Sequence, residues 1–359
     1  MKDLLKKLVT GSIRMARNLF YRHFYRKQIK KEFLLSTDTL PEDYREDIRK
    51  YWRRAAGVRV STDWHRWYTS RNGIRDVRYI PEDLYYCRIE PALNKEQFSV
   101  PLSDKSIFDL LMPDFKRPHT ITRNVNGIFT DSGYGLMTRE QAVEACKVQG
   151  EIVIKPTIDS GGGRRVLFFT PGKGDGATVV IEKMFNEYGR DFIIQESVRQ
   201  HPDLARLNAG SVNTLRILSF LNEDSVVILS TIIRAGLNGC RVDNIVGGGH
   251  SLGVDKNGCF RELGFTKYGE IVTELPNGLK FNGMRVPGYS NAVEIVKTAH
   301  SKLSQFRLIS WDIAIDPDEI PVLIEYNTFY QAINFHQLGN GPLFGDLTDD
   351  VLGFVFGKK

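Results

Sequence analysis

The sequence predicts an α+β fold behind a helical N-terminal region. From about residue 100 onward, apolar runs of strand length alternate with amphipathic helical patterns. Several successive runs are separated by glycine-, proline- or aspartate-rich turns that are short enough for hairpins. Hairpins pair strands in antiparallel fashion, so this mixture is typical of α+β proteins and not of a doubly wound parallel sheet. We therefore expect a helix over residues 1–32, a mostly helical region over 33–99 and a main domain over 100–359.

The N-terminal segment is strongly basic. Residues 1–31 contain ten Lys or Arg side chains and one acid, Asp3, so they carry +9 and leave about −3 for the rest of a chain whose net charge is +6. Apolar residues recur at helical spacing over residues 2–31, which predicts a basic amphipathic helix. Such a helix either docks on its own domain or contacts an anionic membrane surface or a membrane partner. Its aromatic residues follow the helix period and form no stacking platform, which argues against nucleic acid.

The rest of the composition predicts a cytoplasmic protein, peripheral on the inner face of the membrane if the basic helix binds lipid. The four cysteines lie far apart without a CxxC pair, as in proteins with reduced thiols. The first 20 residues lack the unbroken apolar core of a secretory signal. No apolar run approaches the roughly 18 residues that a membrane span needs.

Helices and strands follow from the spacing of apolar residues and from turn signals. Residues 33–95 are rich in Trp, Tyr and Arg, and we expect two or three short helices there, with packing as their role and a share of the substrate site as the alternative. Further helices are expected from near Asp104, from Thr138, where Thr138-Arg-Glu-Gln141 has capping-box form, and over Asn291–Leu303. The predicted strands are Ile152–Lys155, Arg165–Phe169, Phe192–Gln195, Thr214–Phe220, Val226–Ile233, Ser310–Ile315 and Val322–Asn327.

A glycine-rich loop follows the predicted strand that ends at Lys155. The stretch Ser160-Gly-Gly-Gly163 leads into a second strand. Glycine has no Cβ, so this backbone can approach phosphates closely and offer N–H donors, while Lys155 adds a positive charge. Walker and Rossmann loops lead into a helix, and a strand follows here, so we interpret the loop as a flap over a nucleotide. The alternative is a plain glycine hairpin.

A second constellation lies near the C-terminus. Asp312 is in one predicted strand, and Glu325 and Asn327 share one face of the next, across a Pro/Asp-rich turn. Carboxylates among apolar strands are costly unless they are paired or bound to metal. Carboxylate and amide oxygens from adjacent strands suit Mg²⁺ that bridges nucleotide phosphates. The alternative is a surface hairpin with exposed acids.

Together these motifs resemble the ATP-grasp superfamily, over roughly residues 100–345. More closely, they resemble its sugar-transfer-associated branch, which carries a Gly-Trp-Asp-like strand, a Glu-x-Asn strand and an Asn-x-x-x-Gly-Gly stretch. Here Ser310 replaces the glycine before Trp311-Asp312, whereas Glu325-Tyr-Asn327 and Asn244-Ile-Val-Gly-Gly-Gly249 match. The resemblance implies two α+β subdomains that grip ATP, with ATP and Mg²⁺ as cofactors.

The resemblance also implies roles for individual residues. Lys105 and Lys155 look like the two phosphate-binding lysines, and Arg216 looks like the arginine that faces the γ-phosphate and the acyl phosphate. Arg234 and Asn244 flank the same centre. The expected catalytic residues are Arg216, Arg234 and Lys155; the expected nucleotide-binding residues are Lys105, Lys155, Ser160, Gly161, Gly162, Gly163, Gln195, Glu196, Val198 and Asn244; the expected metal ligands are Asp312, Glu325 and Asn327.

The activity that the resemblance implies is an ATP-dependent carboxylate–amine ligase with an acyl-phosphate intermediate. Negative charge that builds on the transferring phosphoryl group would be offset by Mg²⁺, Lys155 and Arg216. The branch suggests an amino acid or other amine joined to a uronic acid in surface polysaccharide synthesis, beside membrane-bound glycosyltransferases. Two alternatives keep the fold: a kinase for a small-molecule or sugar acceptor, and a non-catalytic ATP-binding module.

One motif points to a different chemistry. Gly249-His-Ser251-Leu-Gly253 matches the GxSxG nucleophile elbow, and Asp312 and His336 follow in the order of α/β-hydrolases. An elbow needs a strand, a sharp turn and a helix. Asn257-Gly258 instead signals a hairpin directly after the serine. We therefore expect Ser251 to be structural and His250 to lie near a substrate.

Overall fold

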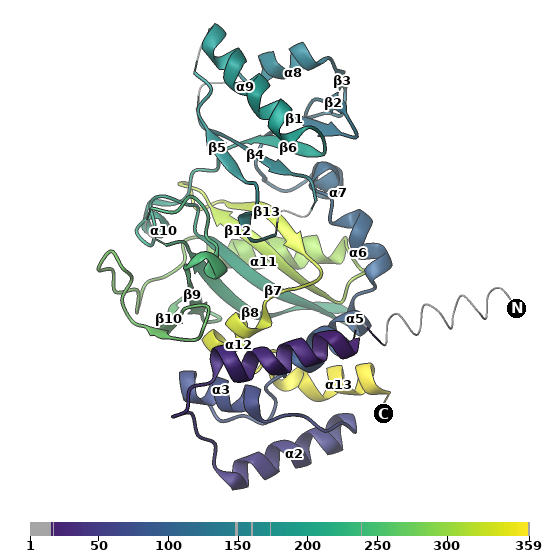
Figure 1. The fold of residues 1–359 in the computed structure, drawn as a ribbon, viewed down its shortest axis with the longest axis vertical. Helices are drawn as coiled ribbons and strands as arrows, with labels where there is room; N and C mark the ends of the chain where they lie inside the picture. The colour runs from purple at the N-terminus through teal and green to yellow at the C-terminus, as the bar shows by residue number, and fades with distance from the viewer. Residues whose placement is uncertain are drawn as a thin grey trace, which may run out of the picture.

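The computed structural model describes residues 16, 18–147, 150–158, 161–172, 174–237 and 239–357, which form three tiers along the long axis of the molecule (Figure 1). A small lobe lies at the top of Figure 1, a larger lobe with the long central strands lies in the middle, and helices from both ends of the chain lie below. Within this described part, no helix is long and apolar enough to cross a membrane.

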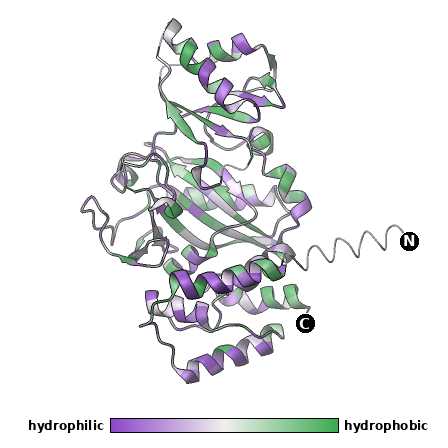
Figure 2. Cartoon of the chain, viewed as in Figure 1, coloured by the Kyte–Doolittle hydropathy of each residue, from purple (hydrophilic) through white to green (hydrophobic). Residues whose placement is uncertain are grey.

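The helical tier begins with a helix at residues 18–28 that continues into the π-helical turn η1 (Ile29–Phe33). Hydrophilic and hydrophobic residues alternate along this helix (Figure 2). Its inward side chains Ile29 and Phe33 pack with Trp64, Trp67 and Tyr68 in an aromatic core. The tier also contains α2 (Glu42–Ala56), α3 (Asp63–Asn72), α4 (Glu82–Leu84), η2 (Tyr85–Ile89), α5 (Glu90–Leu93) and, from the other end of the chain, η6 (Gly345–Leu347) and α13 (Thr348–Phe356). Helix α6 (Glu96–Leu102) lies beside the larger lobe, where Leu102 packs against its core (Figure 1).

The small lobe is a six-stranded antiparallel sheet with helices on one face. The order is β3-β2-β1-β6-β4-β5. Side chains alternate along each strand, so Ile152 and Ile154 enter the core under α8 and α9, while Val153 and Lys155 face the opposite side. Its elements are β1 (Thr120–Val125), β2 (Ile128–Thr130), β3 (Leu136–Met137), α8 (Arg139–Ala145), β4 (Ile152–Pro156), η4 (Gly161–Gly163), β5 (Leu167–Phe169), α9 (Asp175–Tyr188) and β6 (Phe192–Glu196).

The large lobe is a seven-stranded antiparallel sheet in the order β11-β10-β9-β8-β7-β12-β13. Helix α11 (Tyr289–Ser301) covers one face through Ala292, Val296 and Ala299. Helix α12 (Ile333–Asn340) packs on the other face, where His336 reaches Ser230. The remaining elements are α10 (Pro202–Ala205), β7 (Thr214–Asn222), β8 (Ser225–Ala235), η5 (Ile245–Gly247), β9 (His250–Val254), β10 (Phe260–Phe265), β11 (Ile271–Val272), β12 (Leu308–Ile315) and β13 (Pro321–Asn327).

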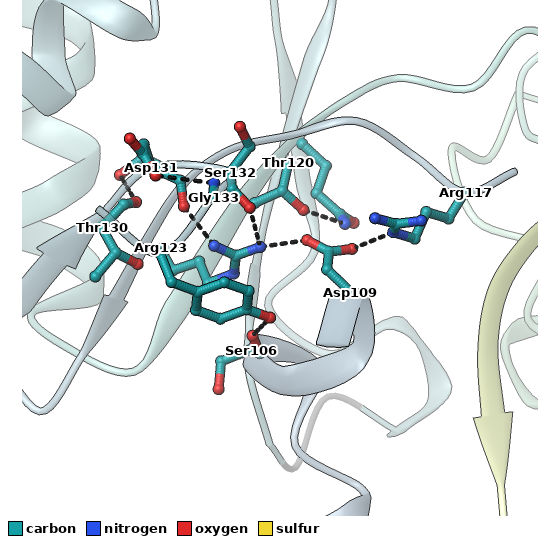
Figure 3. Close-up of polar contacts among 12 residues, drawn as sticks. Ser106, Asp109, Arg117, Thr120, Arg123, Thr130, Asp131, Ser132 and Gly133 are labelled. Carbon is teal, nitrogen blue, oxygen red and sulfur yellow. Dashed lines mark hydrogen bonds and ion pairs between the residues drawn. The ribbon is translucent and has the colours of Figure 1, made fainter. Parts of the chain in front are cut away.

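A short connection, η3 (Lys105–Ile107) and α7 (Phe108–Leu111), joins the helical tier to the small lobe. Asp109 on α7 accepts hydrogen bonds from Arg117 (2.7 Å) and from Arg123 of β1 (Figure 3). The Arg123 guanidinium, which is buried, also donates to the carbonyl oxygen of Asp131. This network ties α7 to β1 of the small lobe.

The α+β prediction is confirmed, and most elements named from the sequence are present. All seven predicted strands form, although the strand expected over Arg165–Phe169 is shorter because a turn occupies Arg165. The capping box at Thr138 is present with both of its hydrogen bonds. The helix expected near Asp104 is only the short pair η3 and α7, capped by the Asp104 carboxylate. The hairpin after Ser251 also forms, as β9 and β10.

Candidate active site

A cavity of about 480 Å³ lies between the two lobes. It is lined by side chains from β4, β5 and β6 above and from β7, β8, β12 and β13 below. Ser160 lies outside the described residues. The predicted site residues that line this cavity are Lys105, Lys155, Gly162, Gly163, Gln195, Glu196, Val198, Arg216, Arg234, Asn244, Asp312, Glu325 and Asn327.

The strand register of the large sheet explains why residues far apart in sequence meet. Arg216 of β7 lies opposite Asp312 of β12, which in turn lies opposite Glu325 of β13. Arg234 of β8 lies opposite Thr214 of β7. Opposed residues in an antiparallel pair project from the same face, so these side chains form adjacent rows beneath the small lobe.

Asp312 is the anionic centre of this face. Its side chain is 1% exposed and accepts a bidentate pair of hydrogen bonds from Arg216, both 2.8 Å, and a third from Arg234 at 3.0 Å. Burial alone would raise the pKa of this carboxyl, but Arg216 and Arg234 hold it below its usual range. Bidentate guanidinium–carboxylate pairs are strong and fix orientation, so Arg216 is held rigidly at the cavity wall. Within the described residues its Nη1 has no partner and can donate into the cavity.

Glu325 and Asn327 are more available than Asp312 as ligands. The Glu325 side chain is 30% exposed and has one ion pair, with Lys105 at 3.4 Å. Asn327 has a buried Nδ2 with no partner, opposite Ser310, whose Oγ is also unpartnered. A carboxylate offers about four lone-pair positions, so Asp312 keeps roughly one after its three bonds. Two carboxylates and an amide therefore fit a hard cation such as Mg²⁺, although no three His, Cys, Asp or Glu side chains of the described part cluster as a ready-made metal site.

Lys155 brings positive charge from the small lobe. Its ammonium group is buried on β4 and has no hydrogen-bond or ion-pair partner among the described residues. Burial is the main cause that lowers its pKa to about 8; Glu325 opposes this shift and the nearby Lys105 adds to it. An unpaired buried ammonium is unfavourable unless an anion joins it, so this residue is prepared for a negatively charged ligand.

The glycine loop is fastened to the large lobe. Gly162 and Gly163 have φ of 70° and 74°, in the left-handed region that favours glycine, and a Cβ on Gly163 would meet Val242 at 3.2 Å. The Asn244 amide donates to the Gly162 carbonyl oxygen at 2.7 Å. Arg241 forms an ion pair with Glu151, just before β4. These contacts close one end of the cavity.

The linker Gln195–Val198 forms another wall. The backbone N–H of Glu196 donates to His119 at 2.9 Å, and that of Ser197 donates to Glu151 at 2.9 Å, which fixes the linker against both neighbouring strands. Apolar side chains approach from the two lobes beside it: Val153, Val166 and Phe168 from the small lobe, and Val212 and Ile324 from the large one. A flat aromatic ligand fits such a slot.

The hydrolase triad suggested by the GxSxG motif is not assembled. Ser251 is buried in the middle of β9 and its Oγ has no partner. His336 bonds through Nδ1 to Ser230 at 2.9 Å, and Asp312 is occupied by the two arginines. A nucleophile elbow requires a sharp turn at the serine, which a strand interior cannot provide.

Two groups in the cavity were not predicted. Asp243, directly before Asn244, pairs with Arg234 at 3.1 Å and accepts a hydrogen bond from Thr214. Phe329 and Tyr330 follow β13, the strand that carries Glu325 and Asn327, and also line the cavity. Neither carries a sequence signal, because only the strand register and the path of the chain after β13 bring them to the cavity.

The pKa of Lys155 gives a prediction for binding. The Lys155 side chain is mostly charged below about pH 8 and mostly neutral above it. An anionic nucleotide binds the charged form, so above about pH 8 binding requires Lys155 to take up a proton. Phosphate groups are fully ionised by about pH 7.5, so the ligand itself does not titrate there. We expect the Kd for Mg·ATP to rise by up to tenfold per pH unit above about pH 8, because each binding event then adds about one proton to Lys155. Calorimetry between pH 7.5 and 9.5 measures this, and Lys155→Arg, which stays charged, should give a flat profile.

Comparison with known proteins gives one family assignment. The family model described as sugar-transfer associated ATP-grasp matches residues 86–350. No curated protein matches the sequence. Solved structures with a similar fold include an L-amino acid ligase from Bacillus licheniformis (12% identity, TM-score 0.39, 73% of this chain and 48% of that one). Another is the biotin carboxylase domain of a 2-oxoglutarate carboxylase from Hydrogenobacter thermophilus, in complex with MgADP (11% identity, TM-score 0.42, 72% and 46%). The chain spans about half the length of these two proteins.

Proposed function

Because the chain belongs to the sugar-transfer-associated ATP-grasp family, we propose that it uses ATP and Mg²⁺ to activate a carboxylate and join it to an amine. The observation that carries this proposal is the single cavity in which Lys105 and Lys155 meet Arg216, Asp312 and Glu325. Cations that face oxygen ligands across a cleft match the needs of phosphoryl transfer, which depends on positioning and charge compensation.

The lining suggests one orientation for the nucleotide. The apolar slot beside the linker Gln195–Val198 would hold the purine, and Lys155, Lys105 and the backbone of Gly162 and Gly163 would hold the phosphates. Glu325, Asn327 and the remaining lone pair of Asp312 would hold Mg²⁺, which supplies charge neutralisation of the phosphate oxygens.

The chemistry follows from this arrangement. A carboxylate oxygen attacks the γ-phosphorus of ATP while the bond from that phosphorus to the bridging oxygen breaks, giving an acyl phosphate and ADP. Arg216, held by Asp312, donates Nη1 protons to the oxygens on which negative charge builds. The amine, after losing a proton, attacks the acyl carbon, and inorganic phosphate leaves. The flap fastened by Asn244 keeps water from the acyl phosphate.

The substrates we propose are a sugar acid, such as a uronic acid, and an amino acid or other amine, in surface polysaccharide synthesis. The family description, sugar-transfer associated ATP-grasp, supports a sugar-linked role. The test is calorimetry with ATP, with and without Mg²⁺, followed by a screen of uronic acids and amines for release of ADP and phosphate. ADP, phosphate and an amide product are expected. ADP with a stable phosphorylated product would indicate a kinase instead, and no Mg²⁺-dependent ATP binding would overturn the proposal.

We also propose that the N-terminal helix contacts an anionic membrane surface. Residues 2–15 and 17 of the predicted helix lie outside the described residues, whereas residues 18–28 are helical and docked through Tyr25. Its outer side chains Leu19, Phe20 and Phe24 are 63%, 67% and 46% exposed among cationic neighbours. Apolar side chains flanked by lysines and arginines suit the surface of an anionic bilayer.

Replacing Leu19, Phe20 and Phe24 together by Ser should lower binding to phosphatidylglycerol vesicles by at least tenfold, since the apolar area that inserts is lost. Vesicle co-sedimentation measures this, with neutral phosphatidylcholine vesicles as the lipid control. Because the docked side chains stay, Mg·ATP binding should not change. Equal sedimentation of the triple variant and the unmodified protein would refute the contact.

A further inference from the structure

A second cavity of about 360 Å³ opens beside the first. Its walls come from the N-terminal helix, from η2, α5 and α6, and from the segment after β13. Phe329 and Tyr330 line both cavities, so the second lies directly behind the residues that follow Glu325 and Asn327. Ile158, at the start of the glycine loop, also reaches it.

The second cavity is lined by acidic side chains, in contrast to the lysines and arginines of the first cavity. Its lining includes two carboxylates, Glu90 and Glu96, and no lysine or arginine of the described chain. Glu90 is 1% exposed, and its Oε1 has no hydrogen-bond partner. Burial raises the pKa of Glu90 well above its usual range, although backbone N–H groups of Tyr330 and Gln331 oppose the shift. A buried carboxylate with an open oxygen is unfavourable until a cation joins it.

Aromatic rings complete the lining. Tyr86 stacks on Tyr25 with centroids 4.8 Å apart, and Tyr330 lies 6.1 Å from Tyr86 at an interplanar angle of 27°. The hydroxyl groups of Tyr21 and Tyr330 are 3.4 Å apart. Faces of tyrosine rings attract ammonium groups, with an effect that increases as water is removed. A buried carboxylate in a cavity lined by tyrosine rings is therefore a site for an organic cation.

The segment that separates the two cavities is held in a strained conformation. Tyr330 and Ala332 have φ of 55°, which is uncommon for residues other than glycine. Gln331 between them is buried, accepts a hydrogen bond from Tyr85 and donates to Leu308 at 2.9 Å. Contacts from η2 and α5 thus keep Phe329 and Tyr330 at the junction, which gives residues 33–95 a role in building the site.

We propose that the second cavity binds the amine substrate as its ammonium ion, with Glu90 as the counter-ion and Tyr86 and Tyr330 as aromatic walls. This inference rests on the proposed function, because a ligase must hold a carboxylate and an amine on the two sides of one reacting centre. The arginines of the first cavity favour the carboxylate, and the acids of the second repel it, so charge alone separates the two substrates. The shared residues Phe329 and Tyr330 mark the place where they meet.

The test uses pairs of compounds in which acetylation of the nitrogen removes the positive charge: glucosamine and N-acetylglucosamine, galactosamine and N-acetylgalactosamine, and putrescine and N,N′-diacetylputrescine. Binding to the full chain with Mg·ADP is measured by calorimetry. We expect at least one free amine to bind at least tenfold more tightly than its acetylated partner, and Glu90→Gln to remove that preference. Glu82→Gln is the matched control, because Glu82 is 4% exposed and also lies near the backbone of this segment, at Asn334, yet lines neither cavity.

Each outcome bears on one proposal only. If Mg·ADP binds but no amine of the panel does, or if acetylated and free amines bind equally, the amine site is wrong and the nucleotide site stands. If the unmodified chain fails to bind Mg·ADP, the proposed function itself fails. Should Glu90→Gln not fold, Ser103→Trp fills the same cavity from its exposed rim, and amine binding that survives this change would overturn the site.

Discussion

Replacing Glu325 by Gln should lower ATP turnover by about 100-fold or more, the scale seen when one electrostatic stabiliser is removed. The change is isosteric and removes the charge that would hold Mg²⁺ against the phosphates. The fold should be unaffected, because Glu325 is 30% exposed and its single ion pair, with Lys105, is long at 3.4 Å. Steady-state release of ADP measures turnover, and the melting temperature measures stability.

Glu262→Gln is the control for this variant. Glu262 is an exposed carboxylate on β10 of the same sheet, outside the cavity, so its loss removes the same charge at a distance. Turnover of the control should remain within about twofold of the unmodified protein, as for a surface substitution. Near-normal turnover in Glu325→Gln would show that this residue is not a metal ligand.

Local sequence signals predicted the strands that carry the site but not the ion pairs within it. Lys155, Glu325 and Asn327 could be named because each lies in a short motif on one strand. The bidentate pair between Arg216 and Asp312 joins residues 96 positions apart, and it exists because β7 pairs with β12 in one particular register. Register between distant strands is set by tertiary packing and cannot be read from either strand alone.

In the helical region over residues 33–95, contacts between distant parts of the chain were even harder to predict from the sequence. Its buried acids Glu82 and Glu90 look like ordinary surface residues in the sequence. They become buried because the segment after β13 folds back against η2 and α5, where Tyr85 reaches Gln331 across 246 positions. Asn94 likewise donates to Leu308 at 2.6 Å and to Thr328 at 2.5 Å. No periodicity in the sequence indicates such contacts, so the sequence favours packing as the role of this region and leaves a share of the substrate site as the alternative.

The arginine pair also changes what Asp312 is expected to do. The sequence placed it as one of three metal ligands, yet in the structure most of its acceptor capacity is used by Arg216 and Arg234. Its larger contribution is to hold two guanidinium groups at the centre of a cavity where negative charge would build. A substitution there therefore affects stability as well as chemistry, in contrast to Glu325.

Asp312→Asn should destabilise the protein by about 3–5 kcal/mol, because removing one partner of a buried ion pair leaves the other charge uncompensated. Arg234 keeps Asp243, whereas Arg216 keeps one neutral amide oxygen as acceptor and meets an NH2 donor in place of the other oxygen, with no anion left beside it. Urea unfolding at pH 7 measures the loss. The pKa of Asp312 is depressed in the folded protein, so its contribution is present above the unfolded value of about 3.9 and is lost as the pH falls below it. The difference between variant and unmodified protein should therefore shrink in acid.

Asp109→Asn is the control that distinguishes a loss of stability from a loss of catalytic activity. Asp109 is another buried carboxylate between two arginines, Arg117 and Arg123, but it lies outside the cavity (Figure 3). Both substitutions should lower the free energy of unfolding by a similar amount, since each leaves a buried guanidinium without its anion. At a temperature where both variants are folded, only Asp312→Asn should lose ATP turnover, because Arg216, which we propose faces the transferring phosphoryl group, is held by Asp312 and not by Asp109. Equal turnover in the two variants would mean that Asp312 is a structural ion pair and that Arg216 does not act on the substrate.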